Sequence, residues 1–247
     1  MPVALITGAS RGFGYALASA LAAQGWDLVI DAREPTALAA AADRLRSRRP
    51  SPAEPVTVVA VPGDVADPAH RTALAGAVGS FAGLDLLVNN ASVLGPSPQP
   101  ALDRYPIADL EHVLRVNAVA PLALTQALLP QLVTRSGTVV NLSSDAAVEA
   151  YPGWGGYGAS KAALDQLTAI LAAEQPDLPV YAFDPGDMRT DMHQQAFPDE
   201  DISDRPLPET VVPALLRLLD TRPPSGRYRA GDLLHEASAG AAAGAGQ

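Results

Sequence analysis

Short apolar segments alternate with Ala/Leu-rich segments along the whole chain, and this alternation limits the possible folds more than any other feature. The apolar, β-branched segments, which are typical of strands, lie at residues 3–7, 27–32, 56–61, 84–89, 137–143, 179–183 and 226–230. Between them, apolar residues recur at helical spacing. Strands that are apolar throughout are typical of a parallel sheet covered by helices on both faces. The sequence therefore predicts an α/β fold with a doubly wound sheet of about seven parallel strands.

The length and composition predict one domain. A chain of 247 residues suits a single α/β sheet, and neither a repeat nor a linker divides it. We expect residues 1–236 to form the domain and the Ala/Gly-rich segment 237–247 to be a flexible tail. The net charge of −10 argues against a nucleic acid or an anionic membrane as partner. The absence of cysteine and the scattered positions of the four histidines argue against a disulfide or a metal site.

The ends and the most apolar run of the chain predict its compartment. The first residues, MPVALITGAS, place no charged region before an apolar run, so we do not expect a signal peptide. The stretch AVAPLALTQALLPQLV contains prolines and glutamines, and we expect these to interrupt any membrane-spanning helix. Together these features predict a cytoplasmic protein.

A glycine-rich turn, TGASRGFG, follows the first predicted strand and precedes a predicted helix. With glycine at Gly8, Gly12 and Gly14, the backbone there can approach a pyrophosphate, and the helix N-terminus offers free N–H groups to it. The same residues also form G-x-S-x-G, which would place Ser10 where a hydrolase has its nucleophile. That alternative requires an oxyanion-hole loop from an earlier strand, and no strand precedes this one. Nucleotide binding is therefore the favoured interpretation.

The segment YGASK, residues 157–161, contains the one lysine of a chain with sixteen arginines. Spacing of four places Tyr157 and Lys161 on the same face of a helix. A tyrosine has a pKa of about 10, and an ammonium about 5 Å away stabilises its phenolate by about 3 kcal/mol at an effective dielectric constant near 20. We infer that Lys161 supplies most, but not all, of the shift of about three units that would bring the pKa of Tyr157 to neutrality. The alternative is an exposed tyrosine beside a solvated lysine.

Six motifs then follow one another in an order that resembles a known family. They are TGASRGFG, NNAS (89–92), Asn117 in a long helix, NLSS (141–144), YGASK and DPGDMRT (184–190). Together they resemble the roughly 250-residue branch of the short-chain dehydrogenase/reductase family over nearly the whole chain. The chain departs from the family pattern in having NNAS instead of NNAG and in lacking the glycine-rich C-terminal segment. The resemblance implies a Rossmann fold, hydride transfer with NAD(P), and a homodimer or homotetramer.

The resemblance implies a catalytic group of Asn117, Ser144, Tyr157 and Lys161. Tyr157 would protonate the substrate oxygen, Ser144 would polarise it, and Lys161 would also hold the cofactor ribose. The Asn117 carbonyl would hold a water of a proton relay, and Pro121 supports this role because it has no N–H to bond that carbonyl. The alternatives are a proline kink beside a locally satisfied Asn117, and a shift by one residue between Ser144 and its neighbour.

Further residues are implied as cofactor-binding, and two arginines among them favour NADP over NAD. A phosphate dianion suits Arg11 and Arg33, whereas Asp31 would select NAD if it met the ribose. Strand alternation allows only one of Asp31 and Ala32 to do so. Asp64 and Thr190 could alternatively be turn or helix caps. The implied cofactor-binding residues are Gly8, Ser10, Arg11, Gly12, Phe13, Gly14, Arg33, Asp64, Val65, Asn90, Ala91, Tyr157, Lys161, Pro185, Gly186, Met188 and Thr190.

The substrate is expected to be a small carbonyl compound or alcohol. Leu94, Tyr151, Trp154 and Asp187 would surround it, together with the segment 191–205. The leading hypothesis is an NADP-dependent carbonyl reductase or alcohol dehydrogenase. A second is a nucleotide-sensing module that keeps the fold without catalysis, and a third is the serine hydrolase that would use Ser10.

Overall fold

A seven-stranded parallel sheet forms the centre of the computed structural model, which describes residues 1–48 and 56–235. The predicted flexible tail at 237–247 lies outside these residues. The strand order is β3-β2-β1-β4-β5-β6-β7, and every neighbouring pair is parallel, so the predicted doubly wound fold is confirmed. The strands are β1 Val3–Ile6, β2 Asp27–Ala32, β3 Val58–Pro62, β4 Leu86–Asn89, β5 Thr138–Leu142, β6 Val180–Asp184 and β7 Gly226–Arg229.

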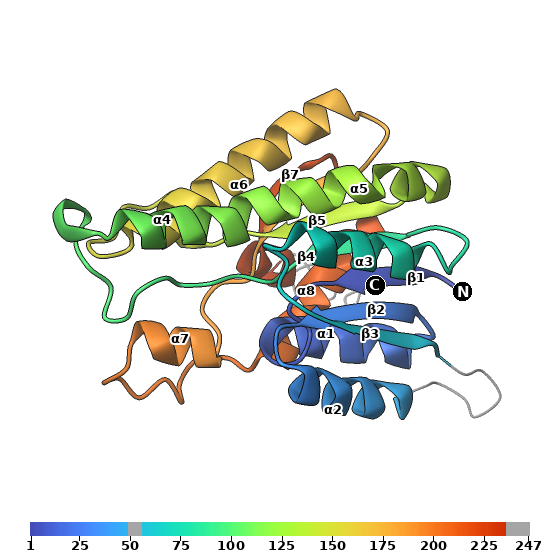
Figure 1. The fold of residues 1–247 in the computed structure, drawn as a ribbon, viewed down its shortest axis with the longest axis horizontal. Helices are drawn as coiled ribbons and strands as arrows, with labels where there is room; N and C mark the ends of the chain where they lie inside the picture. The colour runs from blue at the N-terminus through green and yellow to red at the C-terminus, as the bar shows by residue number, and fades with distance from the viewer. Residues whose placement is uncertain (49–55, 236–247) are drawn as a thin grey trace, which may run out of the picture.

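Helices cover both faces of the sheet, as Figure 1 shows. Alternate side chains of each strand enter opposite cores: Leu28 and Ile30 of β2 pack in one, and Val29 packs in the other. The first core includes residues of α1 Gly12–Ala23, α2 Pro35–Arg46 and α8 Pro208–Thr221. The second includes residues of α3 Pro68–Val78, α5 Ala120–Arg135 and α6 Gly155–Glu174. The burial of both faces explains why the strands are apolar throughout.

One continuous helical stretch runs from Ile107 to Arg135, through α4 Ile107–Leu114, a π-helical turn at Arg115–Val119 and α5. The expectation that prolines interrupt it is wrong. The helix continues through Pro121, which comes just after the π-helical turn, and past Pro130. By length and composition, this helix among the described residues could cross a membrane. Half of its apolar window is buried inside the fold, as in the core helix of a globular protein.

The strand order reverses direction beside β1, and this places the predicted motifs together. β2 and β3 lie on one side of β1, and β4 lies on the other. Ligands of doubly wound folds bind outside the carboxyl ends of the strands at such a switch point. The glycine turn follows β1, NNAS includes the end of β4, Ser144 follows β5, and DPGDMRT begins at the end of β6. All four motifs therefore lie at one edge of the sheet.

The segment between β6 and α8 contains a short helix, α7 Asp191–Ala196. It begins because the Thr190 hydroxyl accepts a hydrogen bond from the His193 N–H (3.2 Å), which caps its first turn. In Figure 1 α7 stands beyond the edge of the sheet where the motifs gather.

Candidate functional site

The turn between β1 and α1 has the shape that an anion requires. Gly8 and Gly12 have φ values of 66° and 58°, a left-handed conformation that glycine adopts without strain. The N-cap residue Arg11 makes no side-chain capping bond, and the first turn of α1 has no acidic residue. The N–H groups of that turn are therefore available to a phosphate. A pyrophosphate fits this turn.

Asn90 joins the glycine turn to the end of β4. Its Nδ2 donates to the Thr7 carbonyl (2.8 Å) and to the Gly8 carbonyl (3.2 Å), and the Thr7 hydroxyl accepts from the Asn90 and Ala91 N–H groups (3.0 Å each). A Cβ on Gly14 would lie 2.5 Å from Asn90 Nδ2 and 2.8 Å from the Gly8 carbonyl oxygen, so only glycine fits at that position. The bonds of Asn90 to Thr7 and Gly8 thus fix the shape of the glycine turn.

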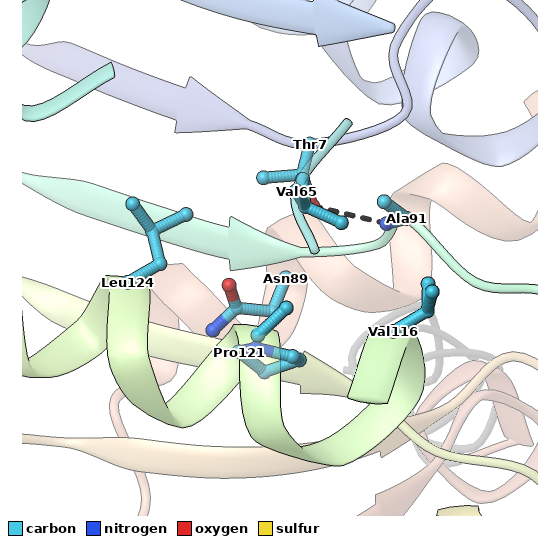
Figure 2. A pocket seen from close by; sticks show the side chains of 8 residues that line it. Thr7, Val65, Asn89, Ala91, Val116, Pro121 and Leu124 are labelled. Carbon is cyan, nitrogen blue, oxygen red and sulfur yellow. Dashed lines mark hydrogen bonds between the residues drawn. The ribbon is translucent and has the colours of Figure 1, made fainter. Parts of the chain in front are cut away.

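A narrow hollow lies between β1, β4 and α5, and Figure 2 shows its lining. The Thr7–Ala91 hydrogen bond, drawn as a dashed line, closes one side of it. Val65, Val116 and Ala91 belong to one small apolar cluster there, and the hollow is too small to admit a water molecule, so these side chains form part of the packed interior. The lining residues are Thr7, Val65, Asn89, Ala91, Val116, Ala120, Pro121 and Leu124.

Asp31 is buried and engaged on both carboxylate oxygens. Only 1% of it is exposed. Oδ1 accepts a hydrogen bond from the Gly8 N–H (2.6 Å), and Oδ2 lies 3.0 Å from His70 Nε2. Burial raises the pKa of Asp31, and its bonds to His70 and Gly8 oppose that rise. Ala32 packs in the core beside α1 and α2, whereas Arg33 is exposed. A cofactor ribose at the end of β2 would therefore lie near the exposed guanidinium of Arg33. The carboxylate of Asp31 already has Gly8 and His70 as partners.

The two arginines expected near a 2′-phosphate are both on the surface. Arg11 Nη1 pairs with Asp191 Oδ2 at 2.8 Å, and the two side chains are 73% and 72% exposed. An exposed ion pair of this kind contributes little stability, so a phosphate could replace Asp191 as the partner of Arg11.

Several other predicted cofactor residues have structural bonds. Asp64 Oδ1 accepts a hydrogen bond from the Ala66 N–H (2.8 Å), so Asp64 caps a turn, as its alternative role predicted. Thr190 likewise caps the helix α7. The Phe13 ring is buried against Phe183, so only its backbone could face a cofactor. Gly186 has φ 70° and donates its N–H to Asp184 Oδ1 (3.0 Å). Pro185 begins this turn, and the Met188 side chain packs partly buried against the core. Their cofactor contacts stay predictions.

Ser10, the residue of the hydrolase alternative, is half-buried in the glycine turn. A nucleophilic serine needs a histidine as its base. His70 is bonded to Asp31, and His193 lies 3.7 Å from Asp187 and packs on Phe197. Both rings thus have other partners, and neither is hydrogen-bonded to Ser10.

Tyr157 and Lys161 are buried together in the first two turns of α6. They are 9% and 2% exposed, and Lys161 Nζ lies 5.5 Å from the centre of the Tyr157 ring. The ammonium also donates to the Leu142 carbonyl (2.6 Å), at the end of β5. Burial lowers the pKa of Lys161 to about 8. The predicted proximity on one helical face is present, and the alternative of an exposed pair is wrong.

The expected lowering of the tyrosine pKa is not seen in the chain alone. Burial raises the pKa of Tyr157, the carboxylates of Asp184 and Asp145 raise it further, and only the nearby hydroxyls of Ser144 and Ser92 oppose the rise. The prediction counted the field of Lys161 and left out the loss of water around the phenol, which disfavours phenolate. In this structure desolvation is the larger effect.

The two neighbouring serines have different surroundings. Ser143 is buried, and its Oγ donates to Asp165 Oδ2 (2.8 Å), which is a structural role. Ser144 Oγ donates to Asp145 Oδ1 (2.9 Å) and accepts from the Ala146 N–H (3.2 Å). The Ser144 hydroxyl is thus the one beside the phenol, as predicted.

Asn117 lies inside the π-helical turn, and its side chain fastens a loop of the site. Oδ1 accepts from the Val93 N–H, and Nδ2 donates to the Val93 carbonyl and to Ser160 Oγ, each at 2.9 Å. The local satisfaction considered as an alternative therefore holds for the amide. Pro121 cannot bond the Asn117 carbonyl, and the proton-relay role of that carbonyl stays a prediction.

An apolar wall lies against Tyr157. Leu94, Ala146 and Tyr157 form a cluster with Trp154, Met192 and Ala196, and the Trp154 ring centre is 5.8 Å from those of Tyr157 and Phe197. Of the other predicted substrate residues, Tyr151 is exposed and donates to Asp145 and Glu149, and Asp187 lies 3.7 Å from both His193 and Arg205. Phe197 lies in the segment 191–205 that was expected to surround the substrate, whereas no motif pointed to Ala146. Within the described ranges, no three metal-ligating side chains gather.

Comparison with known proteins agrees with this geometry. A family model for short chain dehydrogenase matches residues 2–201. Mouse sepiapterin reductase is 36% identical over 205 residues, 78% of this chain and 77% of the relative. Serine 3-dehydrogenase of Rhizobium radiobacter is 37% identical over 172 residues, 69% of this chain and 64% of the relative. A solved short chain dehydrogenase of Shigella flexneri complexed with NADP has a TM-score of 0.85 and 28% identity, with 93% of this chain and 97% of that chain covered.

Proposed function

Since this chain belongs to the short-chain dehydrogenase/reductase family, we propose that it is an NADP-dependent carbonyl reductase or alcohol dehydrogenase. Members of this family are NAD(P)-dependent oxidoreductases. The observation that carries the proposal is the buried contact of Tyr157 with Lys161 at the edge of the sheet where the glycine turn also lies. Perturbed pKa values gather at functional sites, and burial lowers the pKa of Lys161 to about 8 beside the phenol, so the contact supports catalysis.

The residues present suit the proposed chemistry. A bound nicotinamide would supply the hydride in reduction and accept it in oxidation. The Tyr157 hydroxyl gives its proton to the substrate oxygen in reduction and takes it back in oxidation. The Ser144 hydroxyl, which donates to Asp145 in this structure, turns to donate its one hydrogen bond to that oxygen. The Lys161 ammonium stabilises the phenolate that Tyr157 becomes.

Three observations support NADP as the cofactor. Arg33 is exposed at the end of β2, and Arg11 has only an exposed aspartate as its partner. The competing carboxylate, Asp31, is bonded to Gly8 and His70. Two solved relatives, from Shigella flexneri and Escherichia coli, are complexed with NADP and NADPH.

We expect the wild-type protein to prefer NADPH over NADH, and Arg33→Ala to reduce that preference by about tenfold or more, because a charge-assisted hydrogen bond contributes about 1.5–3 kcal/mol. The ratio of kcat/KM for the two cofactors measures the effect. Arg104→Ala is the control, because Arg104 is also exposed but lies in the short 3₁₀ helix Leu102–Arg104 before α4. A clear preference of the wild type for NADH would contradict the assignment.

The wall of Leu94, Trp154, Met192 and Phe197 favours an apolar or aromatic substrate. The test of the function is a panel of ketones, diketones and secondary alcohols, with acetophenone and 1-phenylethanol as aromatic members and turnover followed by nicotinamide absorbance. Sepiapterin joins the panel because it appears in the name of the mouse relative. NADPH binding without turnover of any member would favour the sensing module. Ester cleavage without cofactor would favour the hydrolase.

A further inference from the structure

Arg227 of the last strand reaches three parts of the site. Nη2 donates to Asp184 Oδ2 (2.7 Å) at the end of β6 and to the Ser144 carbonyl (2.9 Å) after β5. Nε donates to Asp165 Oδ2 (3.1 Å), and Asp165 lies one helical turn beyond Lys161 on α6. The planar guanidinium makes these bonds as a fork, which a lysine ammonium could not reproduce.

The two carboxylates that Arg227 binds are close to the reacting groups and poorly solvated. Asp184 is 2% exposed, and its other oxygen accepts from the Gly186 N–H. Negative charge on Asp184 raises the pKa of Tyr157, and Asp165 and Asp184 both raise that of Lys161. Buried carboxylates without a counter-charge would therefore hinder formation of the phenolate.

We propose that Arg227 is a positioning residue of this enzyme: it compensates the charges of Asp184 and Asp165 behind the Tyr157–Lys161 pair and holds the main chain at Ser144. This inference rests on the proposed function. The Arg227 side chain is 25% exposed, so water partly screens its ion pairs with Asp165 and Asp184. It joins a strand at the edge of the sheet to the catalytic centre.

The charged groups around the phenol determine the direction of the expected effect. Asp145 and Asp184 raise the pKa of Tyr157. Two cations face this region: Lys161 on α6, 5.5 Å from the centre of the Tyr157 ring, and Arg227 on β7, whose 2.7 Å ion pair compensates the charge of Asp184. Arg229, also on β7, lies 3.9 Å from Asp184 but is 58% exposed, so solvent screens it. Loss of Arg227 should therefore raise the tyrosine pKa, and loss of the Asp184 charge should lower it.

The test is the pH dependence of kcat for oxidation of 1-phenylethanol by NADP⁺, in which Tyr157 must be deprotonated. In Arg227→Gln the ascending limb should move to higher pH by about one unit, a tenfold loss below it, with KM for NADP⁺ changed less than about twofold. Arg229→Gln removes the same charge from the same strand and should leave the limb in place.

The Asp184→Asn variant should shift the pH profile in the opposite direction, because it removes a negative charge that raises the pKa of Tyr157. Its limb should move to lower pH, and the double variant Asp184→Asn/Arg227→Gln should return toward the wild type. A merely structural role would lower the yield of folded protein or reduce kcat at every pH, without moving the limbs in opposite directions. Should Arg227→Gln fail to fold, the pH profile of kcat for Asp184→Asn is the remaining test of the charge balance at Asp184. An unmoved or alkaline-shifted limb in Asp184→Asn, or an unmoved limb in folded Arg227→Gln, overturns the inference. Absence of turnover in the wild type would instead contradict the proposed function.

Discussion

Tyr157→Phe is expected to lower kcat for carbonyl reduction by about 10³-fold, because a positioned general acid contributes about 10²–10⁴-fold. The phenol lies against the apolar wall of Leu94, Ala146 and Trp154, where a substrate carbonyl could meet its hydroxyl. Phenylalanine fills the same volume and removes only the hydroxyl, so the fold and NADPH affinity should change little.

The measurement compares steady-state reduction with NADPH affinity from fluorescence titration. Tyr181→Phe is the matched control, because Tyr181 is also fully buried and its hydroxyl bonds only the distant Pro223 carbonyl (2.8 Å). Both variants lose one hydroxyl from a buried ring, and only the loss at Tyr157 should abolish turnover. Retention of more than about a tenth of wild-type activity in Tyr157→Phe would remove this residue from its assigned role.

Lys161→Met should lower kcat/KM for NADPH-dependent reduction by about 10²-fold, because it removes the charge that stabilises phenolate and the predicted contact with the cofactor ribose. Burial lowers the pKa of Lys161 to about 8. The ammonium is therefore charged below pH 8 and is lost as the pH rises through that value. Wild-type kcat/KM should decline above pH 8, and the Lys161→Met profile should lack that decline.

In the same experiment, Lys161→Arg separates the effect of the positive charge from the effect of the shape of the lysine side chain. An arginine stays charged at every accessible pH, so this variant should show no decline above pH 8, whatever its maximal rate. Lys161→Met turnover within about threefold of the wild type would contradict the role of the ammonium.

The fold could be predicted from the sequence because local pattern and global architecture agree. The strand segment 27–32 has the predicted bounds, because an apolar run between turn residues is a local signal. The glycine turn was equally predictable, since a strand, three glycines and a helix in succession suit one backbone shape. The prolines of the long helix predicted an interruption that the structure does not have. A π-helical turn at 115–119 lies just before Pro121, and the helix continues through it.

The contacts of Asp31 with His70 and of Arg227 with Asp165 could not be predicted, because the two partners of each contact lie far apart in the sequence. Asp31 and His70 are separated by 39 positions, and Arg227 lies 62 positions from Asp165. No spacing rule connects such residues. The direction of the Tyr157 pKa shift also depends on burial, which the sequence near position 157 does not reveal. Contact between Tyr157 and Lys161 was predictable because a helix sets the spacing of residues four apart.

The most direct test of the account is a titration of the Tyr157 phenol in the presence and absence of NADP⁺. The difference in phenolate absorbance between the wild type and Tyr157→Phe isolates this one hydroxyl from the other tyrosines. Without NADP⁺ the pKa should lie above the ordinary tyrosine value, as burial dictates. The account predicts that NADP⁺ lowers it toward neutrality, because the oxidised nicotinamide adds a positive charge beside the phenol and Lys161. A pKa that does not move when NADP⁺ binds would contradict it.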